Sequence, residues 1–332
     1  MFKEVQQMSD ASDTRLQVGV SACLLGKQVR FDGGHSRSKL CLETLSVYSD
    51  FHPFCPEMAA GFGTPRPAMR LVGDPEQPTL TYSKKKDASL PVEDLTETLR
   101  AGYRDQLKTL GDLDAYILMR NSPSCGLERI KVYQKSGYPH EKKTRGLFTQ
   151  DLMNTNPLLP MEEEGRLNDH ALRENFILRA YTNHFFKREV LAAGTVSALI
   201  DFHSRYKLIV MAHNLEAYQE LGQMVANPHE HELEELLGLY HRYLMTALAK
   251  PAKRKSHTNV LMHILGFLKK SIPGPARQSI AKTINDYRVG QLPLITPLTL
   301  LKHYIHLCGT PYIRKQRYLS PYPEDLGLRN QI

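Results

Sequence analysis

The first half of this 332-residue chain has the pattern of a buried strand, then an amphipathic helix, then a second buried strand. The runs LQVGVSAC (residues 16–23) and LDAYILMRNS (residues 113–122) are short, apolar and bounded by turn residues, which is typical of buried strands. Between them, apolar residues recur every four positions and predict an amphipathic helix that ends at Gly111. This order predicts an α/β domain with a mostly parallel, Rossmann-like sheet and helices on its faces.

The pattern changes in the second half of the chain. From about Leu191 onwards, apolar residues recur at three- and four-residue spacing in several segments that prolines separate. This spacing predicts five or six helices that form a separate all-α bundle. The expected organisation is a flexible N-terminal tail, an α/β domain, a connecting helix or linker and the helical domain, over residues 1–15, 16–168, 169–193 and 194–332.

Composition limits the kind of protein this is. Hydrophobic residues make up 41% of the chain, yet no apolar run approaches the roughly 20 residues that a membrane helix needs. The N-terminus lacks the apolar core of a signal peptide, so we expect a soluble protein of the cytoplasm. Thiols stay reduced there, so the five cysteines are expected to be buried side chains, metal ligands or a nucleophile.

Charge is distributed unevenly along the sequence. Residues 1–170 contain 22 Lys and Arg against 23 Asp and Glu, whereas residues 171–332 contain 21 against 12. Between Leu236 and Asn285 the chain has nine basic residues and no acidic one. This excess indicates an acidic polymer as partner, nucleic acid first of all, although a solvated surface is the plainer interpretation. The residues expected to contact the partner are Lys253, Arg254, Lys255, Lys269 and Lys270.

Three cysteines, Cys23, Cys55 and Cys125, each lie just past an apolar run. Ligands of parallel sheets bind at the carboxyl ends of the strands, which is where these thiols are expected. Taken singly, a cysteine is more often a small buried hydrophobe, and we assign Cys41 and Cys308 to that class. A zinc site is disfavoured because the sequence contains no Cys-x-x-Cys. A catalytic thiol is disfavoured because no histidine near these cysteines would activate the nucleophile. Three thiolates can instead hold an iron–sulfur cluster by three corners and leave one iron open as a Lewis acid.

The residues around these cysteines include several candidates for a site. Glu57 comes two residues after the second cysteine and is suited to proton transfer, or simply to the start of a helix. Ser122 and Ser124 flank a proline in the third cysteine turn and are able to orient a substrate, or only to shape the turn. Arg66 lies between two prolines, as a cation for a phosphate or as a surface residue. Asp32 is equally compatible with a turn and with a substrate ligand.

Three segments, VSACLLG…VRFDG, CPE…TPRP and SPSCG, together resemble the TudS-type thiouracil desulfidases over roughly residues 16–168. The resemblance implies an α/β domain that carries a 4Fe-4S cluster on three cysteines and uses a glutamate and a serine in catalysis. The matching positions are Cys23, Cys55 and Cys125 for the cluster, Glu57, and Ser122 as opposed to Ser124.

The second half, with FHSRYKLIVMAHN and SHTNVLMHILGFLKK among its segments, resembles the YbgA-like helical domain over about residues 194–330. The two domains in one chain are similar to the RudS-type desulfidases, which convert 4-thiouridine in tRNA to uridine. The resemblance implies a non-redox enzyme that releases hydrogen sulfide and has tRNA as its partner. Two alternatives stay open, namely a desulfidase of free thiouracil or 4-thio-UMP, and a non-catalytic RNA-binding sensor with an iron–sulfur cluster.

Overall fold

The structure of the protein is a computed structural model, and it describes residues 15–83, 93–134 and 136–330. The tail expected at the N-terminus lies outside these described residues, apart from Arg15. The chain divides into two compact units, and the boundary falls between Asn168 and Asp169. The segment expected to connect the domains belongs to the second unit, where it forms helix α5 (His170–Phe186) and a π-helical turn, Lys187–Leu191.

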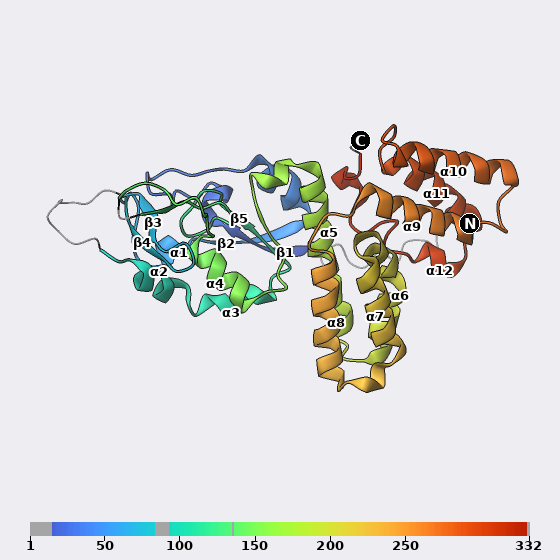
Figure 1. The fold of residues 1–332 in the computed structure, drawn as a ribbon, viewed down its shortest axis with the longest axis horizontal. Coiled ribbons are helices and arrows are strands. Elements are labelled where there is room, and N and C mark those ends of the chain that lie inside the picture. Colours follow the sequence, from blue (N-terminus) through green and yellow to red (C-terminus); the bar gives the residue numbers. More distant parts are fainter. Residues whose placement is uncertain (1–14, 84–92, 135, 331–332) are drawn as a thin grey trace. The chain divides into compact units, whose positions relative to one another are not determined.

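The first unit contains a parallel four-stranded sheet with the strand order β2-β1-β5-β7 (Figure 1). Its strands are β1 (Leu16–Ser21), β2 (Ser49–Phe54), β5 (Ala115–Leu118) and β7 (Met161–Glu163). The two apolar runs that predict buried strands form β1 and β5, so the predicted α/β class is confirmed. Pro53 is accommodated in β2 because this strand lies at the edge of the sheet.

A second, three-stranded sheet was not expected from the sequence. It consists of β3 (Met69–Gly73), β4 (Pro78–Tyr82) and β6 (Val132–Tyr133) in the order β4-β3-β6. Strand β3 pairs antiparallel with β4 and parallel with β6. These strands are short and their sequences lack a clear alternation of apolar and polar residues, which explains why the pattern gives little signal for them.

The first unit also contains helices that lie beside its strands (Figure 1). They are α1 (Pro56–Ala59), α2 (Thr96–Tyr103), α3 (Gln106–Thr109) and α4 (Leu147–Thr155). The continuous helix predicted up to Gly111 is interrupted after α2 and ends in a 3₁₀ turn, Leu110–Asp112. Helices α2 and α4 pack Tyr103 and Phe148 against Tyr116 of β5, with ring centroids of Phe148 5.2 Å and 5.8 Å from the two tyrosines.

The parallel sheet brings the ends of three strands to one edge. Strand β1 runs into a 3₁₀ turn, Ala22–Leu25, that contains Cys23. Strand β2 ends directly before Cys55, which is the N-cap of α1. Strand β5 leads into the turn that contains Cys125. The strand alternation predicted from the sequence is therefore what places the three cysteines at the same end of the sheet.

The second unit is a region of consecutive helices, as predicted (Figure 1). After α5 come α6 (Val196–His213), α7 (Leu215–Ala226), α8 (Leu233–Ala247), α9 (Arg254–Phe267), α10 (Gly274–Arg288), α11 (Ile295–Cys308) and α12 (Pro311–Arg314). Side-chain caps fix several helix starts, because Asp169, Thr195 and Asn214 accept hydrogen bonds from the first-turn N–H groups of α5, α6 and α7. No helix within the described part of the chain is both long enough and apolar enough to span a bilayer.

Buried histidines make the helical unit sensitive to acid. His257 of α9 is 6% exposed, and its Nδ1 lies 2.8 Å from the hydroxyl of Tyr318. Burial, with a smaller contribution from Arg329, lowers the pKa of His257 to about 3. The folded unit therefore keeps this imidazole neutral, whereas the unfolded chain protonates it below its ordinary pKa of 6.5. The stability that the folded unit has with a neutral His257 is complete above pH 6.5, and it is lost as the pH falls towards 3.

We expect the free energy of unfolding to fall more steeply with acidification in the wild type than in His257→Gln. The difference in slope should be about 1 kcal/mol per pH unit between pH 6 and pH 4, because only the wild type takes up this proton on unfolding. Urea unfolding followed by helical circular dichroism at several pH values measures it. Parallel pH curves for the two proteins would contradict the assignment.

Candidate functional site

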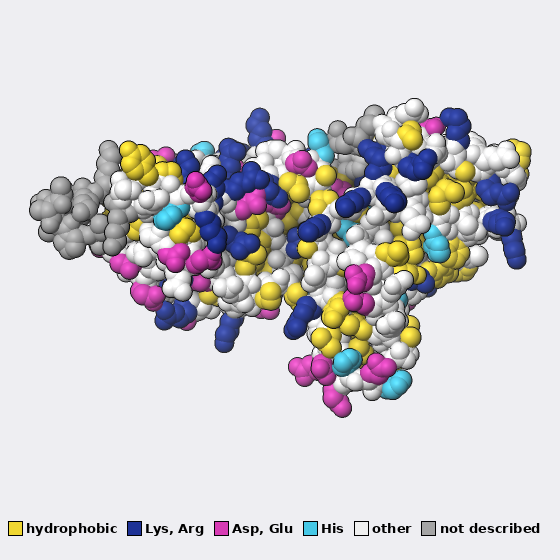
Figure 2. Space-filling model, viewed as in Figure 1, with side chains coloured by type: hydrophobic (Ala, Val, Ile, Leu, Met, Phe, Trp, Pro, Cys, Tyr) yellow, Lys and Arg dark blue, Asp and Glu magenta, His cyan; other side chains and the backbone are white. Residues whose placement is uncertain are grey.

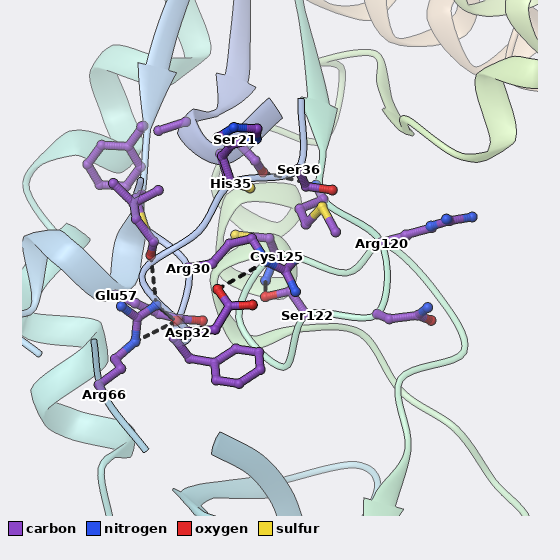
Figure 3. A pocket seen from close by; sticks show the side chains of 18 residues that line it. Ser21, Arg30, Asp32, His35, Ser36, Glu57, Arg66, Arg120, Ser122 and Cys125 are labelled. Carbon is purple, nitrogen blue, oxygen red and sulfur yellow. Dashed lines mark hydrogen bonds and ion pairs between the residues drawn. The ribbon is translucent and has the colours of Figure 1, made fainter. Parts of the chain in front are cut away.

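A cavity of about 530 Å³ lies at the edge of the sheet where the cysteines meet (Figure 3). Cys23, Cys55 and Cys125 all line it, whereas Cys41 and Cys308 do not. The three lining thiols come from turns after three different strands, so the sheet topology alone brings them together.

Burial and neighbouring charges raise the pKa values of the three thiols. Burial, and next the neighbouring Cys55, raise the pKa of the Cys23 thiol to about 11. Burial also raises the pKa of Cys55, and it raises that of Cys125 well above the ordinary value, with further contributions from Cys55 and Glu57. Metals bind the thiolate form, and three buried thiolates are costly unless cations compensate them. The trio is therefore suited to a cationic inorganic core.

Three cysteine thiols from separate turns are a set of donors that an iron–sulfur cluster uses. Within the described ranges, no group of three His, Cys, Asp or Glu side chains is arranged to hold one metal ion. A four-iron cluster has a different requirement, because each thiolate binds a separate iron of a larger core. In addition, burial and then the charges of the three thiols raise the pKa of Tyr116, and its hydroxyl has no hydrogen-bond partner among the described residues. These residues fit a 4Fe-4S group.

Glu57 is held at the cavity by two side chains from other segments. It lies in the first turn of α1, and its side chain is 12% exposed. The Oε1 atom accepts a hydrogen bond of 2.8 Å from Ser124 Oγ, and Oε2 accepts one of 3.1 Å from Arg66 Nε and pairs with Nη2. Each carboxylate oxygen has two lone pairs, so Oε1 can still accept a hydrogen bond from water in the cavity.

Arg66 has a different environment from the one expected for a phosphate-binding cation. Besides its pairing with Glu57, it donates from Nη1 to the carbonyl of Gly63 at 2.6 Å and from Nη2 to the carbonyl of Val29 at 3.1 Å. Its side chain is only 3% exposed. A desolvated guanidinium must satisfy its donors within the protein. Arg66 therefore orients Glu57, although it also lines the cavity.

The two candidate serines take different positions. Ser122 lines the cavity, and its Oγ accepts hydrogen bonds from the backbone N–H groups of Cys125 at 3.0 Å and Ser124 at 3.3 Å (Figure 3). Its own hydrogen remains to donate into the cavity. Ser124 is fully buried and donates to Glu57. Ser122 is thus placed to contact a substrate, and Ser124 to position the carboxylate.

Asp32 fits both interpretations of the sequence. Its Oδ1 accepts a hydrogen bond of 3.0 Å from the backbone N–H of Gly34, as in a turn, and lies 3.6 Å from Arg30 Nε. Asp32 also lines the cavity, so a substrate can reach its carboxylate.

Three further basic residues line the cavity and were not singled out in the sequence, namely Arg30, His35 and Arg120. Arg30 and His35 flank Asp32 in the segment VRFDGGH, and Arg120 follows β5 by two residues. In Figure 3, Arg120 extends on the side of the cavity opposite to Glu57. These residues lie close in sequence to the expected cysteine turns, and this closeness is the one signal that could have assigned them to the site. It is a weak signal, because arginines at turns are usually surface residues.

The basic residues expected to bind a polyanion do not form one cluster. Lys253 and Lys255 are exposed at the N-terminal end of α9. Arg254 between them donates from Nη1 to the carbonyl of Tyr287 at 2.8 Å, and its guanidinium lies 4.8 Å from the centre of that ring. Arg254 therefore joins α9 to α10 and is less accessible than its neighbours.

Lys269 and Lys270 are exposed just beyond the other end of α9, about 20 Å along the helix from Lys253. Figure 2 shows Lys and Arg side chains over α9 and α10, whereas Asp and Glu side chains gather where α7 meets α8. The acidic end contains the exposed residues Glu230, Glu232, Glu234 and Glu235. Charge is thus segregated within the helical unit.

Two family models match this chain. The model described as 2-thiouracil desulfurase matches residues 18–164, and the model described as protein of unknown function (DUF1722) matches residues 207–323. A solved structure titled as a 4Fe-4S-dependent thiouracil desulfidase, TudS, is 25% identical, covers 49% of this chain and 100% of its own, and superposes with a TM-score of 0.36.

The alignments with two curated relatives cover most of the length of each relative. The uncharacterized protein YbgA of Escherichia coli (strain K12) is 34% identical over 165 residues, which are 49% of this chain and 98% of YbgA. The uncharacterized protein YbbK of Bacillus subtilis (strain 168) is 34% identical over 113 residues, which are 32% of this chain and 71% of YbbK. The chain therefore belongs to the 2-thiouracil desulfurase family by its N-terminal domain and to the DUF1722 family by its C-terminal domain, and it is a homologue of YbgA.

Proposed function

We propose that this protein is a 4Fe-4S-dependent desulfidase that converts 4-thiouridine in tRNA to uridine and hydrogen sulfide. The observation that carries the proposal is the convergence of three cysteine thiols and the Glu57 carboxylate on one cavity. Membership in the 2-thiouracil desulfurase family supports a thiolated pyrimidine as the substrate class.

The reaction replaces sulfur by oxygen without a change of oxidation state. Water adds its oxygen to the thiocarbonyl carbon, the C=S bond becomes C=O, and sulfur leaves with two protons as hydrogen sulfide. A cluster bound by Cys23, Cys55 and Cys125 supplies a Lewis-acidic iron with affinity for soft sulfur.

The side chains around the cavity manage protons and orientation. Glu57 Oε1 accepts the proton of the attacking water and returns it to the departing sulfur. Ser124 and Arg66 fix this carboxylate by the hydrogen bonds to its two oxygens. Ser122, whose oxygen is already held by the turn, donates its hydrogen to a substrate oxygen or to the water. A fixed carboxylate of this kind avoids reorganisation during the reaction.

Sulfide release by the anaerobically reconstituted full-length protein tests the proposal. Three substrates are compared, namely tRNA that contains 4-thiouridine, 4-thio-UMP and 4-thiouracil. We expect kcat/KM to be highest for the tRNA. A higher value for a free compound would reject tRNA but keep the enzyme. A tightly bound cluster with no sulfide release from any substrate would instead favour the non-catalytic sensor.

The helical domain supports an RNA partner through the charges at the start of α9. The N-terminal end of a helix carries partial positive charge, so acidic side chains are the stabilising choice there. This helix has Lys253 and Lys255 instead, and its first turn has no acidic residue. Their position is unfavourable for the helix itself, whereas it suits contact with phosphates.

We expect the double variant Lys253→Glu/Lys255→Glu to weaken tRNA binding at least about tenfold at low salt. The slope of log K against log salt should become shallower by about 0.7 to 0.9 for each phosphate contact that is lost. Binding is measured by fluorescence anisotropy over a series of salt concentrations. Reversal of the exposed residues Lys108 and Lys143 in the first unit makes the same change in net charge and serves as the control. Equal binding by both double variants would remove the start of α9 from the RNA surface.

A further inference from the structure

The hydroxyl of Tyr116 is a buried polar group for which the described part of the chain offers no hydrogen-bond partner. Tyr116 lies in β5 and is 0% exposed, and none of the described residues forms a hydrogen bond with its hydroxyl. Buried tyrosine hydroxyls usually form a hydrogen bond, and a buried hydroxyl without one destabilises the folded protein. Phenylalanine would fill the same space without this cost, so the hydroxyl calls for an explanation.

The surroundings of the ring are built to accommodate it. Gly19 of β1 lies opposite Tyr116 in the parallel register. A Cβ atom at Gly19 would lie 2.3 Å from the Tyr116 ring, so only glycine leaves the space that the ring occupies. On its other side the ring meets Phe148 of α4 in an edge arrangement, with centroids 5.8 Å apart. The ring is therefore fixed, and so is the direction of its hydroxyl.

Tyr116 and Cys125 are members of the same cluster of buried core residues. After burial, the charges that raise the pKa of Tyr116 are those of Cys125, Cys55 and Cys23, in that order. Tyr116 does not line the cavity, whereas the three cysteines do. Its side chain therefore belongs to the hydrophobic core that Cys125 shares, and not to the cavity lining.

Ser21 provides a second hydroxyl on the same side of the site. It is 2% exposed, and its Oγ accepts a hydrogen bond of 3.0 Å from the backbone N–H of Met119. Its hydroxyl also forms a hydrogen bond with Cys125, which favours the thiolate form of that residue. Ser21 thus has a hydrogen-bond partner in the sulfur of Cys125, whereas the Tyr116 hydroxyl has no such partner among the described residues.

We propose that Tyr116 donates a hydrogen bond to a sulfur atom of the bound cluster and thereby raises its reduction potential. The inference rests on the proposed function, since it requires the cluster. Hydrogen bonds to cluster or ligand sulfur stabilise the more negative, reduced state. A tyrosine hydroxyl carries the hydrogen that such a bond needs. Tyr116 is a positioning residue, since the bond acts on the cluster and not on the substrate.

Tyr116→Phe tests the proposal because it removes only the hydroxyl and keeps the ring contacts. The reconstituted full-length variant is compared with the wild type for iron content, for the midpoint potential by film voltammetry, and for the rate at which visible absorption bleaches in air. We expect similar iron content, a more negative potential and faster bleaching. Complete loss of iron from a variant whose cluster-free form is as stable as the wild type also supports contact between hydroxyl and cluster.

Tyr206→Phe is the matched control. Tyr206 lies in α6 of the second unit, is 1% exposed, and likewise has a hydroxyl without a partner among the described residues. Removal of this hydroxyl should leave the potential and the bleaching rate unchanged. An unchanged potential and bleaching rate in Tyr116→Phe would overturn the inference but leave the desulfidase intact. A wild type that binds no cluster on reconstitution would overturn the proposed function itself.

Discussion

Cys125→Ala is expected to abolish cluster binding and to reduce sulfide release by at least about 10³-fold. Cys125 is one of three thiols that line the cavity, and it is 7% exposed. Without it, two thiolates remain to hold four irons. A Lewis-acidic metal contributes several kcal/mol of transition-state stabilisation, and about 4 kcal/mol corresponds to the expected loss in rate. Iron and acid-labile sulfide per chain, together with sulfide release, measure the effect.

Cys308→Ala is the control for this prediction. Cys308 lies at the end of α11 in the helical unit, where its Sγ is 3.1 Å from the carbonyl oxygen of Tyr304. Its removal also deletes one thiol but should leave the iron content and the activity at the wild-type level. A Cys125→Ala protein with full iron content, or a Cys308→Ala protein without iron, would exclude the three-cysteine site.

Strand ends were predictable because a buried strand leaves a clear apolar run in the sequence. LQVGVSAC and LDAYILMRNS form β1 and β5, and the parallel order then places Cys23 and Cys125 at one edge. The position of Cys55 follows from the same rule, although β2 has a weaker apolar pattern. Topology thus carries the main information about the site, and the sequence contains it in the periodicity of short segments.

Side-chain partners were not predictable in the same way. Whether Arg66 points to solvent or to Glu57 depends on the path of the loop between them, which periodicity does not encode. The difference between Ser122 and Ser124 depends on which hydroxyl the turn directs to the cavity. Arg254 is similar, because its partner is the carbonyl of Tyr287, which lies 33 residues away.

The hydroxyl of Tyr116 shows a further limit of sequence patterns. In the run LDAYILMRNS a tyrosine counts as one more apolar residue of a buried strand, and the structure agrees that its ring is in the core. The polar atom at the end of that ring has significance only once its neighbours are known. The ring of such a residue packs in the core while its polar atom has a second role. The apolar pattern of the sequence predicts only the packing.

Glu57→Gln is expected to lower kcat about 10²- to 10⁴-fold while the cluster remains bound. Positioned proton transfer contributes a factor of this size, and glutamine keeps the shape of the side chain but does not carry the proton. The amide can still accept from Arg66 through its oxygen, while its NH₂ group faces the Ser124 hydroxyl, which is able to accept as well as to donate. Single-turnover sulfide release, normalised to iron per chain, separates this loss from any loss of cluster.

Ser124→Ala provides the graded comparison for Glu57→Gln. It removes the hydrogen bond to Oε1 but keeps the carboxylate and its pairing with Arg66. One such bond contributes about 1 kcal/mol, so the expected loss in rate is only about five- to tenfold. Glu57 transfers the proton if the glutamine variant is much slower per cluster than the alanine variant. Equal rates in the two variants would instead mean that Glu57 serves only to hold Arg66 and the neighbouring turns in place, and that the proton moves by another route.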